Sequence, residues 1–475
     1  MLTESSHILL VKPPPSSRAI GGTKSAYVGA PELEHVAAAL APVPCRILDL
    51  SRTELARDFS LDDRASIALA SVAEMIEDRG TVAVGITGYT SQYLWMKAIA
   101  DMVRSIRGSD VFVFAGGVHA TLYPSDFSGL GINAVFSGPF SSAEAMKLSA
   151  LISEHGEGRT GANSLYPLMV CSTGRSPDPR TRFWESSGTV PVLGHVGWMD
   201  KAFGVVTSLG CSRMCPFCTC WRLTEGKLLE RPIEHIRKEL ISAQAAGASY
   251  LYFCEDNLLE SDLAPSIAGL LANFDWNAGV LAYASVPAIL RNADVLRELK
   301  LNGLTQLVVG VECVSDTDLE RLGKRQTVEE IASAIRSCHR IGIEVCAQFM
   351  ILPWHDSADV DRISEFCRDK AISFPMVSFF TPFESGHYRR PVGDEFELMD
   401  LNHALPWVFG RRGPELYDAV AEFYRQAYLP TIQTKAAQQR EWQQPSEQEC
   451  QHRASAAAIL AGDFEREGRR QWADS

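Results

Sequence analysis

The chain has 475 residues, of which 46% are hydrophobic and 22% charged, which is ordinary for a folded protein of two or three domains. Its formal net charge of −13 disfavours DNA or RNA as the main partner, because a phosphate backbone selects a basic surface. No apolar run reaches the roughly 18 residues that span a bilayer, and the N-terminus lacks a secretory-signal pattern. We therefore expect a cytoplasmic protein without a membrane partner.

The first 150 residues alternate short apolar runs with helical patterns. The expected strands are "HILLVKPP" (7–14), "CRILDL" (45–50), "VAVGITGY" (82–89), "VFVFAGGVH" (111–119) and "NAVFSG" (133–138), with helices at 32–41, 61–78 and 91–107. Strands that alternate with helices predict a parallel sheet with helical crossovers. Residues 1–150 are thus predicted to form a doubly wound, flavodoxin-like α/β domain whose ligand lies beyond the C-terminal ends of the strands.

Three further regions follow in the sequence. Residues 151–203 are rich in Gly, Ser, Pro and Arg, which predicts a linker with one ordered strand at "VPVLG" (190–194). Residues 204–385 resume the β/α alternation, with strands expected at 204–208, 250–255, 278–285, 306–312, 343–351 and 377–383. Six such units predict a partial (β/α)6 TIM-type barrel with its site at the C-terminal rim. Residues 386–475 are helical and charged, and we expect a C-terminal helical region that serves as a lid.

Four cysteines lie in "CSRMCPFCTC", directly after the first expected barrel strand. Cys211, Cys215 and Cys218 are spaced C-x3-C-x2-C. Iron–sulfur clusters are normally held by four thiolates, so three ligands leave one iron open to a small chelating molecule. A structural zinc site is the alternative, but it needs a second pair of ligands that only Cys220 and a distant histidine could supply. Cys220 is predicted to be a packing cysteine; a second-sphere or substrate-side position stays open.

This cysteine spacing, with Phe217 before the last cysteine, resembles the radical S-adenosylmethionine (SAM) superfamily. The resemblance implies a 4Fe–4S cluster on Cys211, Cys215 and Cys218. It also implies that the open iron binds the amino and carboxylate groups of SAM, and that an electron from the cluster cleaves SAM to a 5′-deoxyadenosyl radical.

Later segments resemble the same superfamily in order. In "YLYFCEDNLL", Glu255, Asp256 and Asn257 resemble the acidic stretch that receives the methionyl amino group. "LVVGVECVSDTDLERLGKRQT" (307–327) resembles the fourth-strand segment, which implies that Glu312 contacts the ribose. "AQFMILPW" resembles the fifth strand and implies a SAM contact by Gln348, and "FFTPFESG" (379–386) resembles the sixth.

The strand ends of the N-terminal domain are small and polar: "GITGYTSQ", "AGGVHAT" and "FSGPFSS". Glycines let a large planar ligand approach the backbone, and hydroxyls can bind its polar groups. A dinucleotide is disfavoured, because no G-x-G-x-x-G follows the first strand.

These segments resemble the cobalamin-binding domain that precedes the barrel in one radical SAM subgroup. The resemblance implies cobalamin contacts by Thr87, Gly116, Gly117, His119 and Gly138. The fifth-strand end departs from the subgroup, because it reads "SGPFS" where Gly-Glu-Gly-Glu is common. The usual D-x-H-x2-G motif is missing, so we expect cobalt without a protein ligand from below. Tyr93 and Trp95 are predicted either to pack against the corrin or to lie in the core.

Together the two resemblances imply a cobalamin-dependent radical SAM methyltransferase. It would transfer a methyl group from methylcobalamin to a carbon of a small-molecule or peptide natural-product intermediate, as in antibiotic biosynthesis. The electron donor would be a protein such as flavodoxin or ferredoxin. Radical ring contraction, cyclisation or oxidation with the same cofactors is the alternative, and a cobalamin-binding sensor with a structural cluster is a third possibility. The −13 charge disfavours a tRNA-modifying enzyme. The sequence does not identify the substrate.

Overall fold

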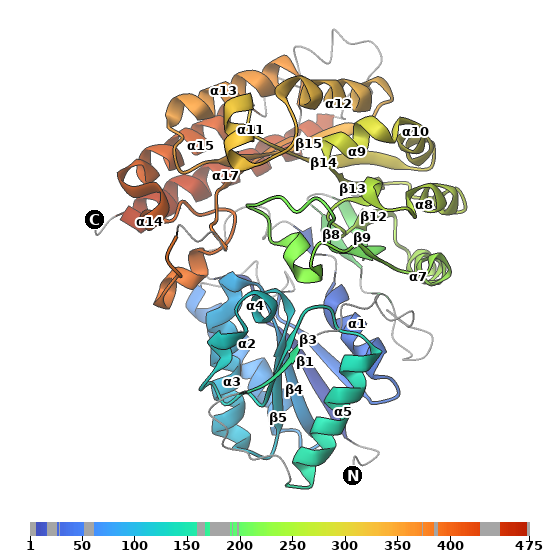
Figure 1. The fold of residues 1–475 in the computed structure, drawn as a ribbon, viewed down its shortest axis with the longest axis vertical. Helices are drawn as coiled ribbons and strands as arrows, with labels where there is room; N and C mark the ends of the chain where they lie inside the picture. Colours follow the sequence, from blue (N-terminus) through green and yellow to red (C-terminus); the bar gives the residue numbers. More distant parts are fainter. Residues whose placement is uncertain are drawn as a thin grey trace.

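The computed structural model of the chain has an N-terminal α/β part, a curved barrel sheet and C-terminal helices (Figure 1). It describes residues 6–16, 26–27, 29–51, 61–158, 167–171, 191, 193–196, 199–372, 374–383, 388–427 and 447–472. The helices among these residues are too short or too polar to cross a membrane.

The N-terminal part is a parallel sheet covered by helices on both faces. Its strands are β1 (His7–Lys12), β3 (Cys45–Asp49), β4 (Thr81–Thr87), β5 (Phe112–Gly116), β6 (Ala134–Ser137) and β7 (Leu168–Cys171), in the order β3-β1-β4-β5-β6-β7. Its helices are α1 (Pro31–Leu40), α2 (Leu61–Glu77), α3 (Tyr93–Arg107), α4 (Gly117–Leu122) and α5 (Ser142–Gly156), with short turns η2 (Thr90–Gln92) and η3 (Pro124–Phe127). The strand order reverses direction at β1, as in flavodoxin-like folds, so the predicted fold of this part is confirmed.

The N-terminal part extends further along the chain than the sequence predicted. The expected boundary at residue 150 falls inside α5, which ends at Gly156. Strand β7 lies within the segment expected to be a linker, and it pairs in parallel with β6. Its residues "LMVC" are too few to stand out as a strand among the surrounding Gly, Ser and Arg. Of the expected strand 190–194, only Pro191, Leu193 and Gly194 are among the described residues.

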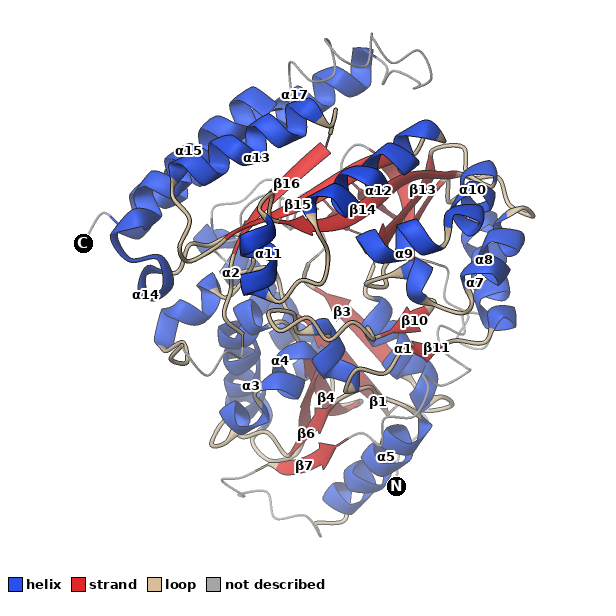
Figure 2. Cartoon of the chain, turned by 45° about the horizontal axis from the view of Figure 1, so that its top comes forward, coloured by secondary structure: helices blue, strands red, loops and turns tan. Residues whose placement is uncertain are grey.

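The barrel sheet curls around an inner face (Figure 2). Its parallel strands are β9 (Met199–Val205), β12 (Tyr250–Phe253), β13 (Gly279–Ala284), β14 (Leu304–Glu312), β15 (Glu344–Ile351) and β16 (Phe374–Phe379). These confirm the predicted partial six-unit barrel. The short β8 (Gly194–Val196) pairs antiparallel with β9, and β2 (Ala26–Tyr27) pairs antiparallel with β8, which adds an N-terminal segment to the barrel sheet.

Helices cover the outer face of this sheet. They are α7 (Ile233–Ala245), α8 (Ala264–Leu271), α9 (Val286–Arg291), α10 (Ala293–Leu301), α11 (Asp316–Leu322), α12 (Val328–Arg340) and α13 (Ser357–Asp369), with the turn η5 (Leu258–Glu260). Alternate strand residues, such as Val345, Ala347 and Phe349 of β15, enter the large core between sheet and helices. Their neighbours on β15, including Cys346 and Gln348, consequently face the barrel interior.

The first barrel strand ends earlier than expected, and a hairpin follows it. Strand β9 ends at Val205, and β10 (Ser208–Leu209) then pairs antiparallel with β11 (Leu229–Glu230). The cysteine loop and the turn η4 (Cys220–Thr224) lie between the two hairpin strands. Two hydrogen-bonded strands thus fix both ends of the loop that carries all four clustered cysteines.

The C-terminal region packs on the barrel. It comprises η6 (Gly393–Leu398), α14 (Pro406–Phe409), η7 (Gly410–Arg412), α15 (Gly413–Ala427) and α17 (Glu447–Trp472). Helices α15 and α17 lie side by side and α13 lies against α15, as Figure 2 shows. Turn η6 instead contacts η2 and α3, so the C-terminal region touches both the barrel and the N-terminal part.

Candidate functional site

The three spaced cysteines lie close together in one half-buried loop. The Cys211 thiol interacts electrostatically with those of Cys215 and Cys218, and burial raises its pKa. The Cys218 N–H donates to the Cys215 carbonyl (3.1 Å), and the Trp221 ring N–H donates to the same oxygen (2.8 Å). The loop backbone is therefore held by internal hydrogen bonds.

A glycine lets this loop leave the hairpin. Gly210 has φ +87°, a conformation that costs other residues free energy, and it immediately precedes Cys211. A Cβ at this position would overlap the Thr224 side chain and the Lys227 carbonyl. Side chains are thus excluded at Gly210 because the end of the hairpin closes tightly over it.

Cys220 lies beside Cys218 rather than in a hydrophobic core. Its N–H donates to the Cys218 sulfur (3.4 Å), and its thiol interacts electrostatically with Cys218 and Asp256. The neighbouring Cys220 lowers the pKa of Cys218. The expectation of a plain packing cysteine is therefore replaced by a residue that contacts a predicted cluster ligand, because η4 folds the chain back over the loop.

The acidic stretch after β12 separates into three environments. Glu255 is buried and accepts hydrogen bonds from the Thr207 hydroxyl (2.5 Å) and N–H (3.3 Å); burial raises its pKa to about 7. Asn257 is also buried, and its amide exchanges hydrogen bonds with Ser285 (3.1 and 3.0 Å). Asp256 alone is turned toward the cysteines, through Cys220.

Glu312 ends β14 in a strained conformation and forms an ion pair. Its φ is +66°, and the pairing of β14 with β15 shifts register between Gly310 and Glu312. The Lys324 ammonium donates to its carboxylate at 2.7 Å, with both side chains largely buried. Burial works to lower the pKa of Lys324, but Glu312 raises it overall. A ligand that contacts Glu312 must share this carboxylate with the lysine.

Lys324 also reaches the cysteine loop. Its ammonium lies 5.6 Å from the centre of the Phe217 ring. Gly323, the residue before it, packs so tightly that a Cβ there would lie 2.8 Å from Pro216. Lys324 was not among the predicted site residues. The signal that could have found it is the "GKRQ" that follows α11, a cation close in sequence to a strand-end carboxylate.

The inner face of the barrel sheet carries uncharged polar side chains. Gln348 is half-buried there, and its amide makes no hydrogen bond to another described residue. On the same face, the hydroxyls of Tyr252 and Tyr283 lie 2.7 Å apart, and their rings meet edge to face. The two tyrosines were missed in the sequence, where "YLYF" and "VLAYA" are ordinary strand patterns.

Glycines and hydroxyls line the C-terminal edge of the N-terminal sheet. Gly117 has φ +89°, and a Cβ there would overlap the Thr87 hydroxyl and lie 3.1 Å from the Gly88 nitrogen. A Cβ at Gly116 would instead enter open space, with its nearest neighbour 3.9 Å away. Gly138 follows β6 with φ +90°, and its N–H donates to the Thr121 hydroxyl at 3.0 Å. The edge therefore exposes backbone over several neighbouring strand ends.

His119 is fully buried inside the N-terminal part. Its Nδ1 lies 3.3 Å from the Thr90 hydroxyl, and its Nε2 lies 3.4 Å from Asp126. Its ring centre lies 4.5 Å from that of Tyr93 and 5.6 Å from that of Phe127. Burial lowers its pKa. The His119 ring is therefore enclosed by side chains, and its expected contact with cobalamin stays a prediction.

Tyr93 and Trp95 belong to the core of the N-terminal part. Both pack against its hydrophobic cluster, and the Tyr93 hydroxyl donates to the Asp126 carbonyl at 2.8 Å. Of the two alternatives for these residues, core packing is the one that the structure contains.

The two predicted sites meet where the N-terminal part faces the barrel. Helix α4, which begins at Gly117, contacts η4, which begins at Cys220. Tyr89 follows β4 with its side chain 60% exposed, and it interacts electrostatically with Cys220 and Cys254 of the barrel. The strand-end glycines and the cysteine loop, more than 70 residues apart in sequence, thus lie on facing surfaces.

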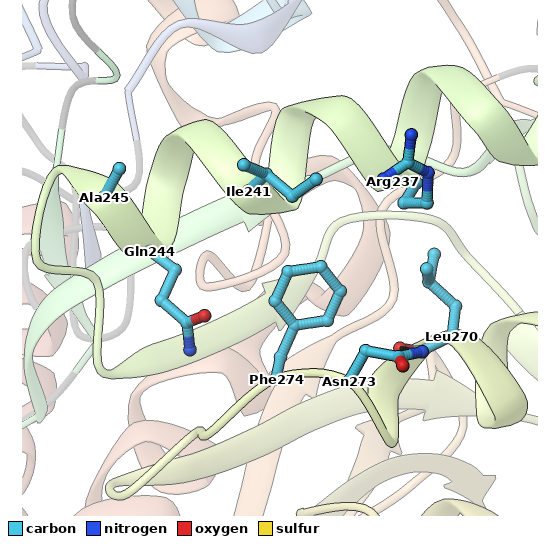
Figure 3. Close-up of a pocket in the computed structure, with 7 residues that line it drawn as sticks. All are labelled: Arg237, Ile241, Gln244, Ala245, Leu270, Asn273 and Phe274. Atoms are coloured by element: carbon cyan, nitrogen blue, oxygen red, sulfur yellow. Dashed lines mark hydrogen bonds between the residues drawn. The ribbon is translucent and has the colours of Figure 1, made fainter.

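Two pockets lie outside this junction. Figure 3 shows one of about 560 Å³ on the outer side of the barrel, where Phe274 lies between side chains of α7 such as Ile241 and Gln244. It contains none of the predicted site residues. The other, of about 720 Å³, is lined by Met214, Pro216 and Lys324 beside the cysteine loop. This second pocket adjoins the cysteine loop.

Residues 205–367 match the family model of the Radical SAM superfamily. This part of the chain is therefore a radical SAM domain, and its expected cofactors are a 4Fe–4S cluster and SAM.

The whole chain shares its fold with cobalamin-dependent radical SAM enzymes. The structure of the methyltransferase TsrM from Kitasatospora setae with cobalamin and a [4Fe–4S] cluster bound has a TM-score of 0.60 at 15% identity, covering 98% of this chain and 99% of that chain. The cobalamin-dependent radical enzyme OxsB, with aqua-cobalamin bound, has a TM-score of 0.57 at 14% identity, covering 78% and 53%. The similarity to this class, predicted from the sequence, is confirmed.

Two curated relatives differ in their named activities. The hopanoid C-3 methylase of Methylococcus capsulatus is 21% identical over 385 residues, 77% of this chain and 72% of that protein. The anaerobic magnesium-protoporphyrin IX monomethyl ester cyclase of Rubrivivax gelatinosus is 23% identical over 387 residues, 73% and 65% of the two chains. A methylase and a cyclase therefore both have sequences similar to this one.

Proposed function

We propose that this chain is a cobalamin-dependent radical SAM methyltransferase that methylates a carbon atom of a small-molecule or peptide substrate. The observation that carries the proposal is the contact between α4 and η4. It brings the glycine-lined edge of the N-terminal sheet to the loop of Cys211, Cys215 and Cys218. Two cofactors at these facing edges would hold their reacting atoms on either side of one substrate, which is the proximity that radical methyl transfer requires.

The donor set of the cysteine loop fits a 4Fe–4S cluster with one open iron. Three thiols of one loop interact electrostatically, and the N–H of Cys220 donates to one of them. Such hydrogen bonds are one means of tuning cluster-bound sulfur. The chemistry that the cluster and SAM supply is reductive cleavage of a sulfonium to a carbon radical. Around them Asp256, Glu312 and Gln348 would bind and orient SAM. Of these, Glu312 is already fixed by Lys324, while the Gln348 amide makes no hydrogen bond within the described chain.

The glycine edge fits a corrin whose rim lies against the exposed backbone of the strand ends. The Gly116 backbone is open on the side that a Cβ would fill, and Thr87 stands beside Gly117. Cobalamin supplies the methyl group to be transferred. Because the His119 ring is enclosed, it is not proposed as a cobalt ligand. The residues that would hold the corrin are Thr87, Gly116, Gly117 and Gly138, and His119 would support them from within.

The inner face of the barrel favours a substrate with an uncharged polar group. One of the two hydroxyls of Tyr252 and Tyr283 donates its proton to the other. The proton of the second hydroxyl has no acceptor among the described residues. Burial raises the pKa of both tyrosines, so they stay protonated donors. A carbonyl or hydroxyl of the substrate would accept the second proton. A reducing protein such as flavodoxin or ferredoxin would supply the electron.

Radical chemistry without methyl transfer is the second candidate. It is favoured by the similarity to the cyclase from Rubrivivax gelatinosus, which extends over 73% of this chain. Cyclisation would use the same cysteine loop and the same glycine edge, so these features do not separate the two reactions.

The test is anaerobic turnover with SAM labelled in its methyl group. The reconstituted protein is incubated with cobalamin, a reductant and an extract fraction as substrate source, and products are separated by mass. A product that gains one labelled methyl group supports the methyltransferase. Formation of 5′-deoxyadenosine together with an unlabelled, rearranged product would replace it with the second candidate. Failure of the chain to bind hydroxocobalamin, seen by absorption, would exclude both.

A further inference from the structure

A segment beyond the sixth barrel strand joins the barrel to the N-terminal part. We call residues 388–403 the strap; they include η6. On the barrel side, the Phe379 N–H donates to the Leu401 carbonyl at 2.7 Å. The Thr381 hydroxyl donates to the Asp400 carbonyl, also at 2.7 Å. The C-terminal end of the strap is therefore fixed to the end of β16.

The other end of the strap is fixed to the N-terminal part. A single guanidinium nitrogen of Arg390, Nη2, donates to both carboxylate oxygens of Asp126, at 2.5 and 2.7 Å. The guanidinium lies 4.9 Å from the centre of the Tyr123 ring. Ser16 donates to the Glu397 carbonyl at 3.0 Å. A hydrogen bond between two charged groups is shorter and stronger than one between neutral groups. Segments 264 residues apart in sequence thus form one geometrically defined contact.

This contact continues to the glycine edge. Asp126 lies 3.4 Å from Nε2 of His119, and the His119 N–H donates to the Gly88 carbonyl at 3.0 Å. His119 belongs to α4, two residues after Gly117. The ring of Phe396, from the strap, lies 5.9 Å from that of His119 and 4.7 Å from that of Tyr93. An unbroken series of contacts therefore runs from β16 through the strap to α4.

We propose that Arg390 is a positioning residue that, through Asp126 and His119, holds α4 and its glycine edge in place against the cysteine loop. The proposal rests on the proposed function for its consequence, which is that the strap sets the position of the corrin relative to the cluster. Helix α4 is only six residues long and lies at the end of a sheet. A helix of that length gains little stability from its own hydrogen bonds and depends on tertiary contacts.

The strap also supplies a matched control. Arg389, the neighbouring residue, forms a two-pronged pair with Glu395 inside the strap, and its side chain is 48% exposed, against 52% for Arg390. Arg389 pairs through two nitrogens and within the strap, whereas Arg390 pairs through one nitrogen with a carboxylate of the N-terminal part. Arg390→Gln and Arg389→Gln each remove one exposed charge and one ion pair, so both variants are expected to fold.

The first measurement is hydrogen exchange by mass spectrometry on the full, reconstituted chain without cobalamin. Arg390→Gln should raise the exchange rate of residues 117–122 about tenfold, and Arg389→Gln should change it less than about twofold, as expected when one tertiary contact holds a local opening closed. Helix α7, remote from the strap, should be unchanged in both. Equal exchange of 117–122 in wild type and Arg390→Gln overturns the proposal.

The second measurement is hydroxocobalamin binding, followed by absorption, and the EPR relaxation of bound cob(II)alamin beside the reduced cluster. Arg390→Gln should raise the dissociation constant about tenfold and slow the relaxation, because an altered distance between the paramagnetic centres weakens their coupling. Arg390→Lys should recover only part of both signals, since lysine keeps one charged donor nitrogen but loses the planar guanidinium beside the Tyr123 ring. Faster exchange with unchanged binding and relaxation would overturn the positioning role. If wild-type protein bound no corrin, the proposed function would fall, and the exchange result alone would decide whether the strap holds α4.

Discussion

The barrel rim and the glycine edge of the N-terminal sheet offer opposite kinds of surface to the cofactors proposed for them. At the barrel rim, ionisable side chains are fixed by buried partners: Glu312 by Lys324, and Glu255 by Thr207. At the glycine edge, bare backbone is exposed, and the ionisable residue of the motif, His119, is turned inward.

The difference follows from the size and chemistry of the proposed ligands. An iron–sulfur cluster and SAM offer charges and metal positions, which thiolates, carboxylates and amides recognise individually. A corrin is broad and would contact several strand ends at once. Glycines at those strand ends leave room for it, whereas side chains would occupy the same space. Substitutions at the barrel rim should therefore change stability or cofactor binding because they change charge. Substitutions at the glycine edge should do so because they add side-chain volume.

The largest expected effect is loss of the cluster. Changing Cys211, Cys215 and Cys218 together to Ala should abolish the roughly four irons per chain that anaerobic reconstitution gives, because no other thiol is spaced to replace them. Iron assay and the visible chromophore measure this. Cys220→Ala is the matched control, since its thiol contacts Cys218 without being a proposed ligand. Loss of iron in that control would contradict the ligand assignment.

Next in size is the effect of breaking the buried ion pair at the barrel rim. Lys324→Met leaves the Glu312 carboxylate buried without its cation, which should lower the unfolding free energy by about 3–5 kcal/mol. Denaturant titration of the cluster-free chain measures it. Arg297→Met removes the exposed partner of Asp294 and should cost less than about 0.5 kcal/mol. Equal losses in the two variants would show that the Lys324 pair is no different from a surface pair.

Glu255 should make the barrel sensitive to pH. Its pKa is raised from 4.5 to about 7 in the folded chain, so its contribution to stability is greatest below pH 4.5 and is lost as pH rises through 7. The loss amounts to about 3 kcal/mol at pH 8. Glu255→Gln carries no titrating proton, so its thermal midpoint should fall less than that of the wild type between pH 6 and 8.5. Parallel curves would mean that Glu255 ionises normally.

The smallest stability effect, and the sharpest test of volume, is expected at the glycine edge. Gly117→Ala places a methyl group against Thr87 at positive φ, which should cost about 1–3 kcal/mol and weaken hydroxocobalamin binding more than tenfold. Gly129→Ala also has positive φ, but nothing lies within 4 Å of its Cβ. Gly129→Ala should lower the unfolding free energy because of its positive φ, but it should leave hydroxocobalamin binding unchanged. Equal binding by both variants would argue against a cofactor at Gly117.

Local patterns in the sequence were enough for the fold class and for the cluster ligands. Alternating β and α patterns predicted both sheets, since a strand or helix face is determined by residues a few positions apart. The C-x3-C-x2-C spacing lies within a single loop, so no long-range information was needed to group the three thiols. Strand β7 was not predicted, because four residues in a Gly- and Ser-rich stretch are too few to show a strand periodicity.

Tertiary structure alone decided what each strand-end side chain contacts. Glu255, Asp256 and Asn257 are adjacent in sequence, yet only Asp256 faces the cysteines, because Thr207 and Ser285 bind the other two from neighbouring strands. His119 follows its glycines in sequence but is enclosed by Tyr93, Asp126 and the strap. Arg390 and Asp126 are 264 residues apart in sequence. Helix and strand periodicity relates only residues a few positions apart, so it cannot predict this contact. Such partners are determined only when the packed core brings distant strand ends and loops to one place.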